Sequence, residues 1–345
     1  MYPATENNEA VKMVCSIPEI RDCAYFTHRA MGTIMSHKLF GNHLDECQSA
    51  IQSEIKALEN LLSRFIPESD ICRINQSSGF QAERIAPETM DILVEALNFC
   101  RTSSGSFDIT VGPLVSLWRN SHSTLQPPAP KSIYRVLDLV SHNDLVLDPS
   151  TCSASLARHG QSIDLGGIGK GFTADRVMDI YREHGITSAF SNLGGNVIAL
   201  GTRPDGSPWR IGIQHPREID RVICSVTVKD RAVVTSGDYQ RFFIDGKGNR
   251  YHHILDSRTG YPAASGLISV TVISTSSLSA DALSTILFIA GIEKGRQYLK
   301  SFPGTDAIFV DEELNIVITP GLEGHFLPNF GMTYSVFKNL DGKNE

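Results

Sequence analysis

A short glycine-rich segment with a single lysine, residues 163–171, is the most unusual chemical feature of the sequence. Its residues are Ile-Asp-Leu-Gly-Gly-Ile-Gly-Lys-Gly, and a helix-like stretch follows. Glycine lets a backbone approach a phosphate closely, and a helix N-terminus offers free N–H groups to an anion. The segment is not a P-loop, because Asp164 occupies the position of the first P-loop glycine and Gly171 follows Lys170. Two interpretations stay open: a phosphate-binding loop that uses Lys170, or a tight turn with an exposed lysine.

Asp281 and Thr285 are four residues apart near the start of another predicted helix, so their side chains share one face. The rest of that helix is apolar, and a carboxylate in such a setting is costly unless it has a partner. One carboxylate, one hydroxyl and a backbone carbonyl suit Mg²⁺, which keeps waters and substrate phosphate as its other ligands. The alternative is that Asp281 simply favours the positive end of the helix dipole.

Two neighbouring histidines, His252 and His253, stand at the start of a strand-like segment that also contains an aspartate and an arginine. On a strand the two imidazoles face opposite sides, and one of them could act as a general base. The alternative is a structural histidine. Zinc is not favoured, because the chain has neither an HExxH segment nor a cysteine cluster.

The elements that must position these residues follow from the periodicity of apolar side chains. Apolar stripes predict helices over residues 44–62, 87–100, 170–184 and 280–302. Strand-like runs cover residues 189–200, 209–213, 224–228, 240–245, 251–255, 268–274 and 307–319. Asp245-Gly246 predicts a hairpin turn between two of these runs.

Helices and strand pairs alternate along the chain, which favours an α+β fold over a doubly wound parallel sheet. We expect two closely packed subdomains with mixed and antiparallel sheets and flanking helices. The proline-rich residues 126–130 are predicted to be a stiff loop that joins the two subdomains. Residues 1–25 are polar and aperiodic, so we expect a flexible arm, followed by one domain over residues 26–330 and a tail over residues 331–345.

Composition excludes several functional classes. The chain has 345 residues, with 31 Lys and Arg against 38 Asp and Glu, so its net charge is −7. Such a chain has no general electrostatic attraction to nucleic acid or to an anionic membrane. The seven cysteines are scattered without a CxxC pair, which indicates reduced thiols. Residues 1–25 contain no apolar signal-peptide core, and no apolar run reaches the roughly 18 residues of a spanning helix. We therefore expect a cytoplasmic protein.

Eight short motifs, taken in their order, make the chain similar to a known family. The motifs are Met31-Gly32-Thr33; Arg64-Phe65 to Ser69 with Asn75; SFDITVGPL (106–114) with Trp118; DLGGIGKG (164–171); NLGGN (192–196); TSGDY (235–239); HILDSRTG (253–260); and ADALST (280–285). In this order the chain resembles the FAD:protein FMN transferases, the ApbE-type flavin transferases. The resemblance extends from about Met31 to Gly291. Each motif alone is short, but eight in the family's order are hard to produce by chance.

The resemblance implies a reaction. Members of that family use Mg²⁺ to split FAD at its pyrophosphate, join FMN through its phosphate to a Thr or Ser hydroxyl of a target flavoprotein, and release AMP. It implies that Asp281, Thr285 and the backbone carbonyl of Gly167 hold Mg²⁺ and that His253 is the catalytic base. It also implies that FAD, as substrate, contacts Met31, Phe65, Ser106, Phe107, Asp108, Asp164, Lys170 and Leu255, in the cleft between the subdomains.

Two positions depart from the family's usual pattern. Ser257 stands where the family usually has proline, which is expected to loosen that turn. Phe65 stands where some members have Tyr or Asn, which could shift the balance between transfer and plain hydrolysis. The alternatives are a Mg²⁺-dependent FAD pyrophosphatase, with water in place of the protein hydroxyl, and a non-catalytic flavin-binding protein. The lack of an export signal suggests a cytoplasmic acceptor, for which a fumarate-reductase-like flavoprotein is one candidate.

Overall fold

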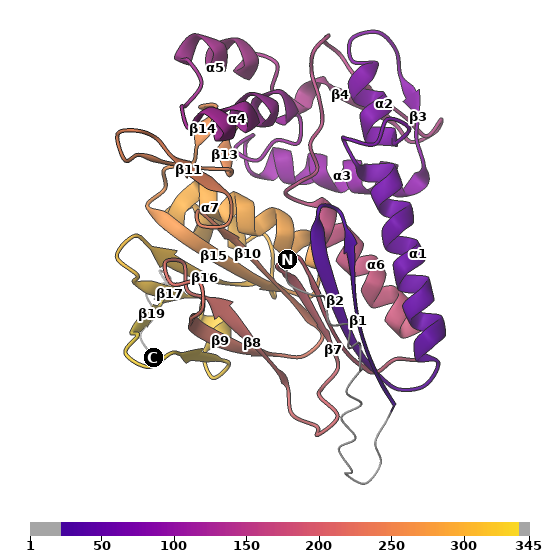
Figure 1. The fold of residues 1–345 in the computed structure, drawn as a ribbon, viewed down its shortest axis with the longest axis vertical. Coiled ribbons are helices and arrows are strands. Elements are labelled where there is room, and N and C mark those ends of the chain that lie inside the picture. The colour runs from indigo at the N-terminus through magenta and orange to yellow at the C-terminus, as the bar shows by residue number, and fades with distance from the viewer. Residues whose placement is uncertain (1–21, 338–345) are drawn as a thin grey trace, which may run out of the picture.

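The computed structural model describes residues 22–337 as an α+β fold built on one large sheet (Figure 1). Its nine strands lie in the order β1 (Cys23–Ala30), β2 (Thr33–Phe40), β6 (Ser188–Leu193), β7 (Asn196–Leu200), β10 (Arg231–Gly237), β15 (Leu267–Ser274), β16 (Asp306–Asp311), β17 (Ile316–Ile318) and β19 (Tyr334–Val336). Neighbouring strands are antiparallel, except that β19 runs parallel to β17. The predicted α+β class is confirmed.

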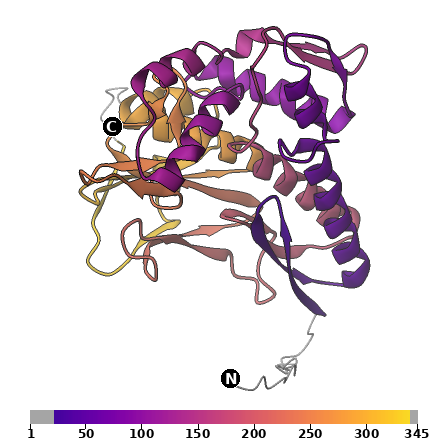
Figure 2. The same cartoon turned by 45° about the horizontal axis from the view of Figure 1, so that its top comes forward.

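Helices cover one face of this sheet, as the edge-on view in Figure 2 shows. The helices are α1 (Leu44–Leu62), α2 (Asp70–Gln76), α3 (Pro87–Thr102), α4 (Gly112–Thr124), α5 (Pro130–Leu137), α6 (Gly169–Glu183) and α7 (Ser277–Leu299), with short 3₁₀ turns at His142–Asp144 and Pro320–Leu322. The two central helices, α6 and α7, contact each other and lie on the sheet beside β7, β10 and β15. Among the described residues, no helix combines the length and the apolar character needed to span a bilayer.

A second, three-stranded sheet covers the opposite face, in the order β18 (Phe326–Pro328), β9 (Val222–Val228) and β8 (Trp209–Gln214). Neighbouring side chains of the large sheet alternate between the two layers: Val234 packs with the helices, whereas Val233 packs with the small sheet. This alternation is what period-two strands buried on both faces require. Smaller sheets pair β11 (Phe242–Ile244) with β12 (Arg250–His252), β13 (Leu255–Asp256) with β14 (Tyr261–Pro262), and β3 (Glu83–Arg84) and β4 (Leu145–Asp148) with β5 (Ser153–Leu156).

The predicted helices correspond to α1, α3, α6 and α7, although α7 begins three residues early at Ser277 and is interrupted at Gly291, where φ is 75°. Two of the strand runs were wrong in one respect, because each is a hairpin of two strands. The run over 189–200 turns at Gly194-Gly195, where both φ angles are positive, and the run over 307–319 turns between Asp311 and Asn315. The hairpin predicted at Asp245 is confirmed as β11 and β12.

Three boundaries need correction. Residues 126–130, predicted to be a loop between subdomains, connect the neighbouring helices α4 and α5, and Pro130 is already the first residue of α5. The predicted arm over 1–25 ends no later than residue 22, because β1 begins at Cys23, and its residues 1–21 lie outside the described part. The predicted tail over 331–345 contains β19, which hydrogen-bonds to β17, while residues 338–345 lie outside the described part.

Candidate active site

The predicted metal ligands meet where the first turns of α6 and α7 approach each other. The backbone N–H of Gly171 donates to Oδ2 of Asp281 at 2.9 Å, and Nζ of Lys170 lies 3.5 Å from Oδ1 of the same carboxylate. A Cβ atom built on Gly167 would lie 3.6 Å from Oγ1 of Thr285. The fold therefore brings the glycine-rich segment and the ADALST motif, more than 100 residues apart, into one place.

These residues fit a divalent cation of the Mg²⁺ type. Asp281 is only 4% exposed, and a buried carboxylate needs compensating charge. The Oγ1 atom of Thr285 lies 3.3 Å from Oγ of Ser236 on β10, and Ser236 also lies 2.8 Å from Oγ of Ser284. Ser236 thus helps to orient the Thr285 hydroxyl. A carboxylate, a hydroxyl and a glycine main chain are hard oxygen donors, which this class of ion prefers.

His253 follows β12 and bonds to the carbonyl of Arg241. Its backbone N–H and its Nδ1 lie 3.0 and 3.2 Å from that oxygen. An imidazole that donates from Nδ1 keeps its lone pair on Nε2, which can accept a proton. His253 is exposed as a whole residue, yet desolvation by the surrounding protein lowers the pKa of its ring to about 4, aided by the charge of Arg241 and more weakly by that of Lys170. His253 is therefore neutral at pH 7, and its ring lies within electrostatic range of Lys170.

The neighbouring His252 has a structural role instead. Its ring is buried, with Nε2 3.1 Å from the carbonyl of Ala263 and Nδ1 accepting from the N–H of Ile254 at 3.2 Å. Burial lowers its pKa as well. Both ring nitrogens already have partners, so of the two histidines only His253 is available as a base.

The SFD turn lies against the glycine-rich segment. The ring of Phe107 comes to 3.0 Å from the Cβ position of Gly167. Ser106 is buried, and its carbonyl accepts a hydrogen bond from the Ser257 hydroxyl at 2.9 Å, as does the carbonyl of Gly105 at 2.5 Å. Ser257, which stands where the family usually has proline, therefore joins its own turn to the SFD turn.

The Asp108 side chain stabilises this turn through hydrogen bonds. Its Oδ1 accepts from the N–H and hydroxyl of Thr110 at 2.8 and 2.7 Å, and its Oδ2 lies 2.8 and 2.9 Å from the backbone N and Nδ1 of His142. Cys100, which is buried, lies beside them, so that its Sγ, an Asp108 oxygen and a nitrogen of the half-buried His142 are within 4.8 Å of one another. Burial, with the charge of Asp108, raises the pKa of that thiol, so it stays protonated. The hydrogen bonds between Asp108 and His142 account for the approach of these two side chains, and the Asp108 side chain holds the loop.

Asp164 and Phe65 form the flank of the site. Oδ2 of Asp164 accepts from Arg64 at 2.6 Å, and Oδ1 accepts from the N–H of Gly166 at 2.8 Å, so both oxygens orient protein groups. Phe65 is 61% exposed, and the guanidinium of Arg119 lies 4.5 Å from its ring centroid. The exposed ring is available to stack on a planar ligand.

Met31 and Leu255 complete the predicted set. Met31 is at the tip of the β1–β2 hairpin with φ 49°, and its sulfur lies 3.5 Å from the hydroxyl of Thr173 on α6. The predicted residue is therefore close to the first turns of α6. The side chain of Leu255 belongs to a separate apolar cluster with Trp118 and Phe243. At that position only the main chain is left to line a ligand site.

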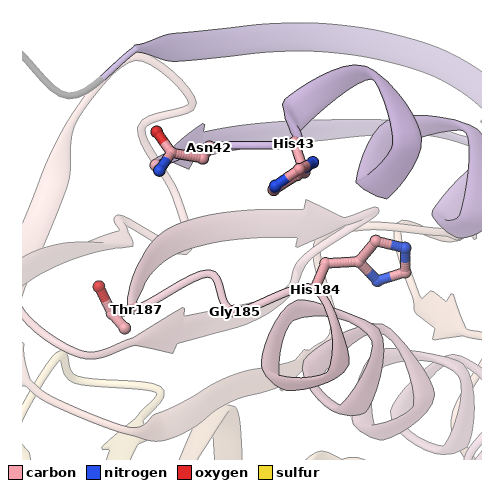
Figure 3. A pocket seen from close by; sticks show the side chains of 6 residues that line it. Asn42, His43, His184, Gly185 and Thr187 are labelled. Carbon is pink, nitrogen blue, oxygen red and sulfur yellow. The ribbon is translucent and has the colours of Figure 1, made fainter.

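Two cavities lie away from these residues. The first, of about 390 Å³, is shown in Figure 3 and is lined by His43 before α1 and by His184 after α6. Since α6 rises 1.5 Å per residue, this cavity is roughly 20 Å from the helix end that carries Lys170. The second, of about 350 Å³, lies on the small sheet beside Arg210 and Leu327.

The fold defines the class of protein. The structure resembles the crystal structure of the ApbE protein from Thermotoga maritima, with a TM-score of 0.78, 32% identity, and coverage of 86% of this chain and 96% of that one. It also resembles the flavin transferase ApbE from Vibrio cholerae, with a TM-score of 0.77, 25% identity, and coverage of 88% and 99%.

Sequence comparisons identify the family. The ApbE family profile matches residues 31–309. The FAD:protein FMN transferase of Klebsiella pneumoniae strain 342 is 37% identical over 299 residues, which is 86% of this chain and 92% of that protein. The protein of the same name from Treponema pallidum is 32% identical over 293 residues, with coverage of 81% and 80%. The chain belongs to the ApbE family, so the predicted resemblance and the prediction of a transferase are confirmed.

Proposed function

We propose that this chain is a Mg²⁺-dependent FAD:protein FMN transferase. The observation that carries the proposal is the meeting of Asp281, Thr285 and Gly167 beside Lys170. Metal ligands, an anion-binding helix end and a base are the parts that phosphoryl transfer requires. A protein that only bound flavin would need neither the metal ligands nor the base.

Each residue has a role in this proposal. Asp281, Thr285 and the Gly167 carbonyl hold Mg²⁺, which when bound neutralises charge on the FAD pyrophosphate. Lys170 and the first turn of α6 bind phosphate oxygens. Nε2 of His253 accepts the proton of the acceptor Thr or Ser hydroxyl. The hydroxyl oxygen then bonds to the FMN phosphorus, and the bond from that phosphorus to the oxygen of AMP breaks.

The remaining predicted residues would shape the flavin site. The exposed ring of Phe65 offers a stacking surface for the isoalloxazine, and Phe107 and Met31 line the space near Gly167 and α6. Asp164 would contribute by orienting Arg64 and the N–H of Gly166. Ser106, Asp108 and the main chain of Leu255 would contribute by holding the loops that border the flavin site.

We place the reaction in the cytoplasm, with a flavoprotein as the acceptor. All six cysteines among the described residues are free, which suits a reducing compartment. A fumarate-reductase-like flavoprotein stays a candidate acceptor. The net charge of −7 gives no general attraction to nucleic acid or to an anionic membrane.

The test is to incubate the purified protein with FAD, with Mg²⁺ or EDTA, and with or without a flavoprotein that carries a candidate acceptor Thr or Ser. Flavin fluorescence on the acceptor in a denaturing gel, together with AMP released only with Mg²⁺, would support the transferase. Free FMN and AMP formed at the same rate with and without acceptor would instead identify a pyrophosphatase. FAD that binds but is never cleaved would leave a binding protein.

A further inference from the structure

The helices that carry the site cap each other. Gly171 and Asp175 share one face of α6 because they are four residues apart, and Ser277 and Asp281 do the same on α7. The N–H of Gly171 donates to Asp281 at 2.9 Å, while the N–H of Ser277 donates to Asp175 at 2.6 Å. The carboxylate of each helix thus accepts from the free first-turn N–H groups of the other.

Asp175 holds the first turn of α7 at three points. Besides the Ser277 N–H, its carboxylate accepts from the N–H of Leu278 at 3.0 Å and from the hydroxyl of Ser276 at 2.9 Å. Ser276 is the N-cap residue of α7 and itself accepts from the N–H of Ser279. An aspartate on α6 therefore fixes where α7 starts.

The two helix starts would otherwise repel each other. Each N-terminus carries about half a positive charge, and the two lie in contact. A Cβ on Gly171 would come to 2.4 Å from the carbonyl of Ser277 and 2.7 Å from Cβ of Asp281. Asp175 and Asp281 place negative charge at this junction, and desolvation there raises the pKa of Asp175.

We infer that Asp175 is a positioning residue for the metal site, since it sets the place of Asp281 and Thr285 relative to Gly167 and Lys170. The inference rests on the metal site of the proposed function. Asp281 lies one helical turn after Ser277, so a shift of the first turn of α7 would move the carboxylate that is proposed to bind the metal. Both carboxylate oxygens of Asp175 accept from donors at the start of α7, so in this proposal Asp175 acts through α7 and not as a metal ligand.

The test measures direct binding of Mn²⁺, a spectroscopic substitute for Mg²⁺, to the protein in the absence of FAD. The electron paramagnetic resonance signal of free Mn²⁺ monitors the binding. In Asp175→Asn an amide N–H group replaces one acceptor oxygen at a junction of donors. We expect a Mn²⁺ dissociation constant about tenfold higher than in the wild type. In assays with FAD, the half-saturating metal concentration should rise similarly, while turnover at saturating metal stays within about threefold.

The matched control is Asp179→Asn, one turn further along α6, where the carboxylate is 47% exposed and pairs with Arg182 on the same helix. It should leave Mn²⁺ binding unchanged, and Asp281→Ala should abolish it. If the wild type and Asp281→Ala behave as expected but Asp175→Asn binds Mn²⁺ like the wild type, Asp175 does not position the site and the proposed function stands. If the wild type binds no Mn²⁺, both the metal site and this role of Asp175 are wrong.

Discussion

The low pKa of His253 has a kinetic consequence at the scale of a single residue. Because its pKa is lowered from 6.5 to about 4, the ring keeps its basic form down to about pH 4. If it is the general base, kcat/KM with FAD and acceptor should fall as the pH drops through about 4, and not near 6.5. An acid limb near 6.5 would contradict the assignment.

Substitution of the same residue separates binding from catalysis. His253→Ala should bind FAD with an unchanged dissociation constant, while the transfer rate falls by about 10²- to 10⁴-fold, the usual contribution of a general base. His184→Ala is a matched control, since its Nδ1 also bonds to a backbone carbonyl, at 2.9 Å, but at the far end of α6. Full activity of His253→Ala in a gel assay for flavin transfer would show that another group is the base.

Lys170 should affect the binding of FAD. Lys170→Ala removes a charge-assisted contact with phosphate, so the FAD dissociation constant should rise about tenfold. The rise should be smaller at high salt, because salt screens the charge of the lysine. Titration of flavin fluorescence in the absence of metal measures this. Lys56→Ala is the control, because that lysine is exposed and pairs with Glu59 on α1. Equal affinities for the two variants would make Lys170 a bystander.

Residue types revealed much of the candidate site, but their partners did not follow from the sequence. Asp164 was expected to contact FAD, and nothing local indicated that Arg64, 100 positions earlier, takes one of its oxygens. Asp175 is an ordinary aspartate in a helix, and its role depends on residues 276–278 of another helix. Such roles come from tertiary contacts, which a motif does not encode.

At the scale of elements, the close approach of α6 and α7 can be tested with Gly171. In Gly171→Ala the new methyl group would meet backbone atoms of α7 at 2.4 to 2.8 Å, and backbone cannot yield as a flexible side chain can. We expect a loss of about 1–3 kcal/mol in the free energy of unfolding, measured with urea. Gly169→Ala, whose Cβ has its nearest neighbour at 3.7 Å, should be nearly neutral. Equal stability of the two variants would contradict the close packing.

The elements that could be predicted are those with a strong apolar stripe. On α1 the buried residues Cys47, Ile51, Ile55, Leu58 and Leu62 follow the helical period throughout, and the predicted ends are the observed ones. The β1–β2 hairpin was missed because its buried residues include His37, which does not mark a core position in a sequence. Helix α4 was missed although Leu114 and Trp118 are buried on one of its faces, because residues 119–124 at its end are all polar.

His37 also sets a prediction for the whole molecule. Its ring is fully buried, with Nδ1 2.7 Å from the Ser191 hydroxyl, and it stacks on Phe26 and His28. Burial, with the charge of His28, lowers its pKa to about 3. Below about pH 6.5 this histidine takes up a proton in the unfolded chain but stays neutral in the folded chain. The free energy of unfolding should therefore fall as the pH is lowered from 6.5 to 3.

The size of this effect follows from proton linkage. One proton contributes a slope of about 1.4 kcal/mol per pH unit, and His37→Gln should reduce the slope of unfolding free energy against pH by that amount. Urea unfolding at pH 7, 6 and 5 provides the measurement. His43→Gln, which makes the same change at an exposed histidine, is the matched control. An unchanged slope in His37→Gln would show that this ring is not what makes the fold sensitive to acid.

The mutual caps of α6 and α7 also determine how the molecule can open. In many proteins helix ends fray independently, and ligand sites lie in segments that unfold locally at little cost. Here the first turn of either helix cannot unravel without releasing the N–H groups or the carboxylate that stabilise the other. The two ends should therefore open together as one cooperative unit. Entry of a nucleotide is then expected to depend on movement of the surrounding loops, while both helix ends stay closed.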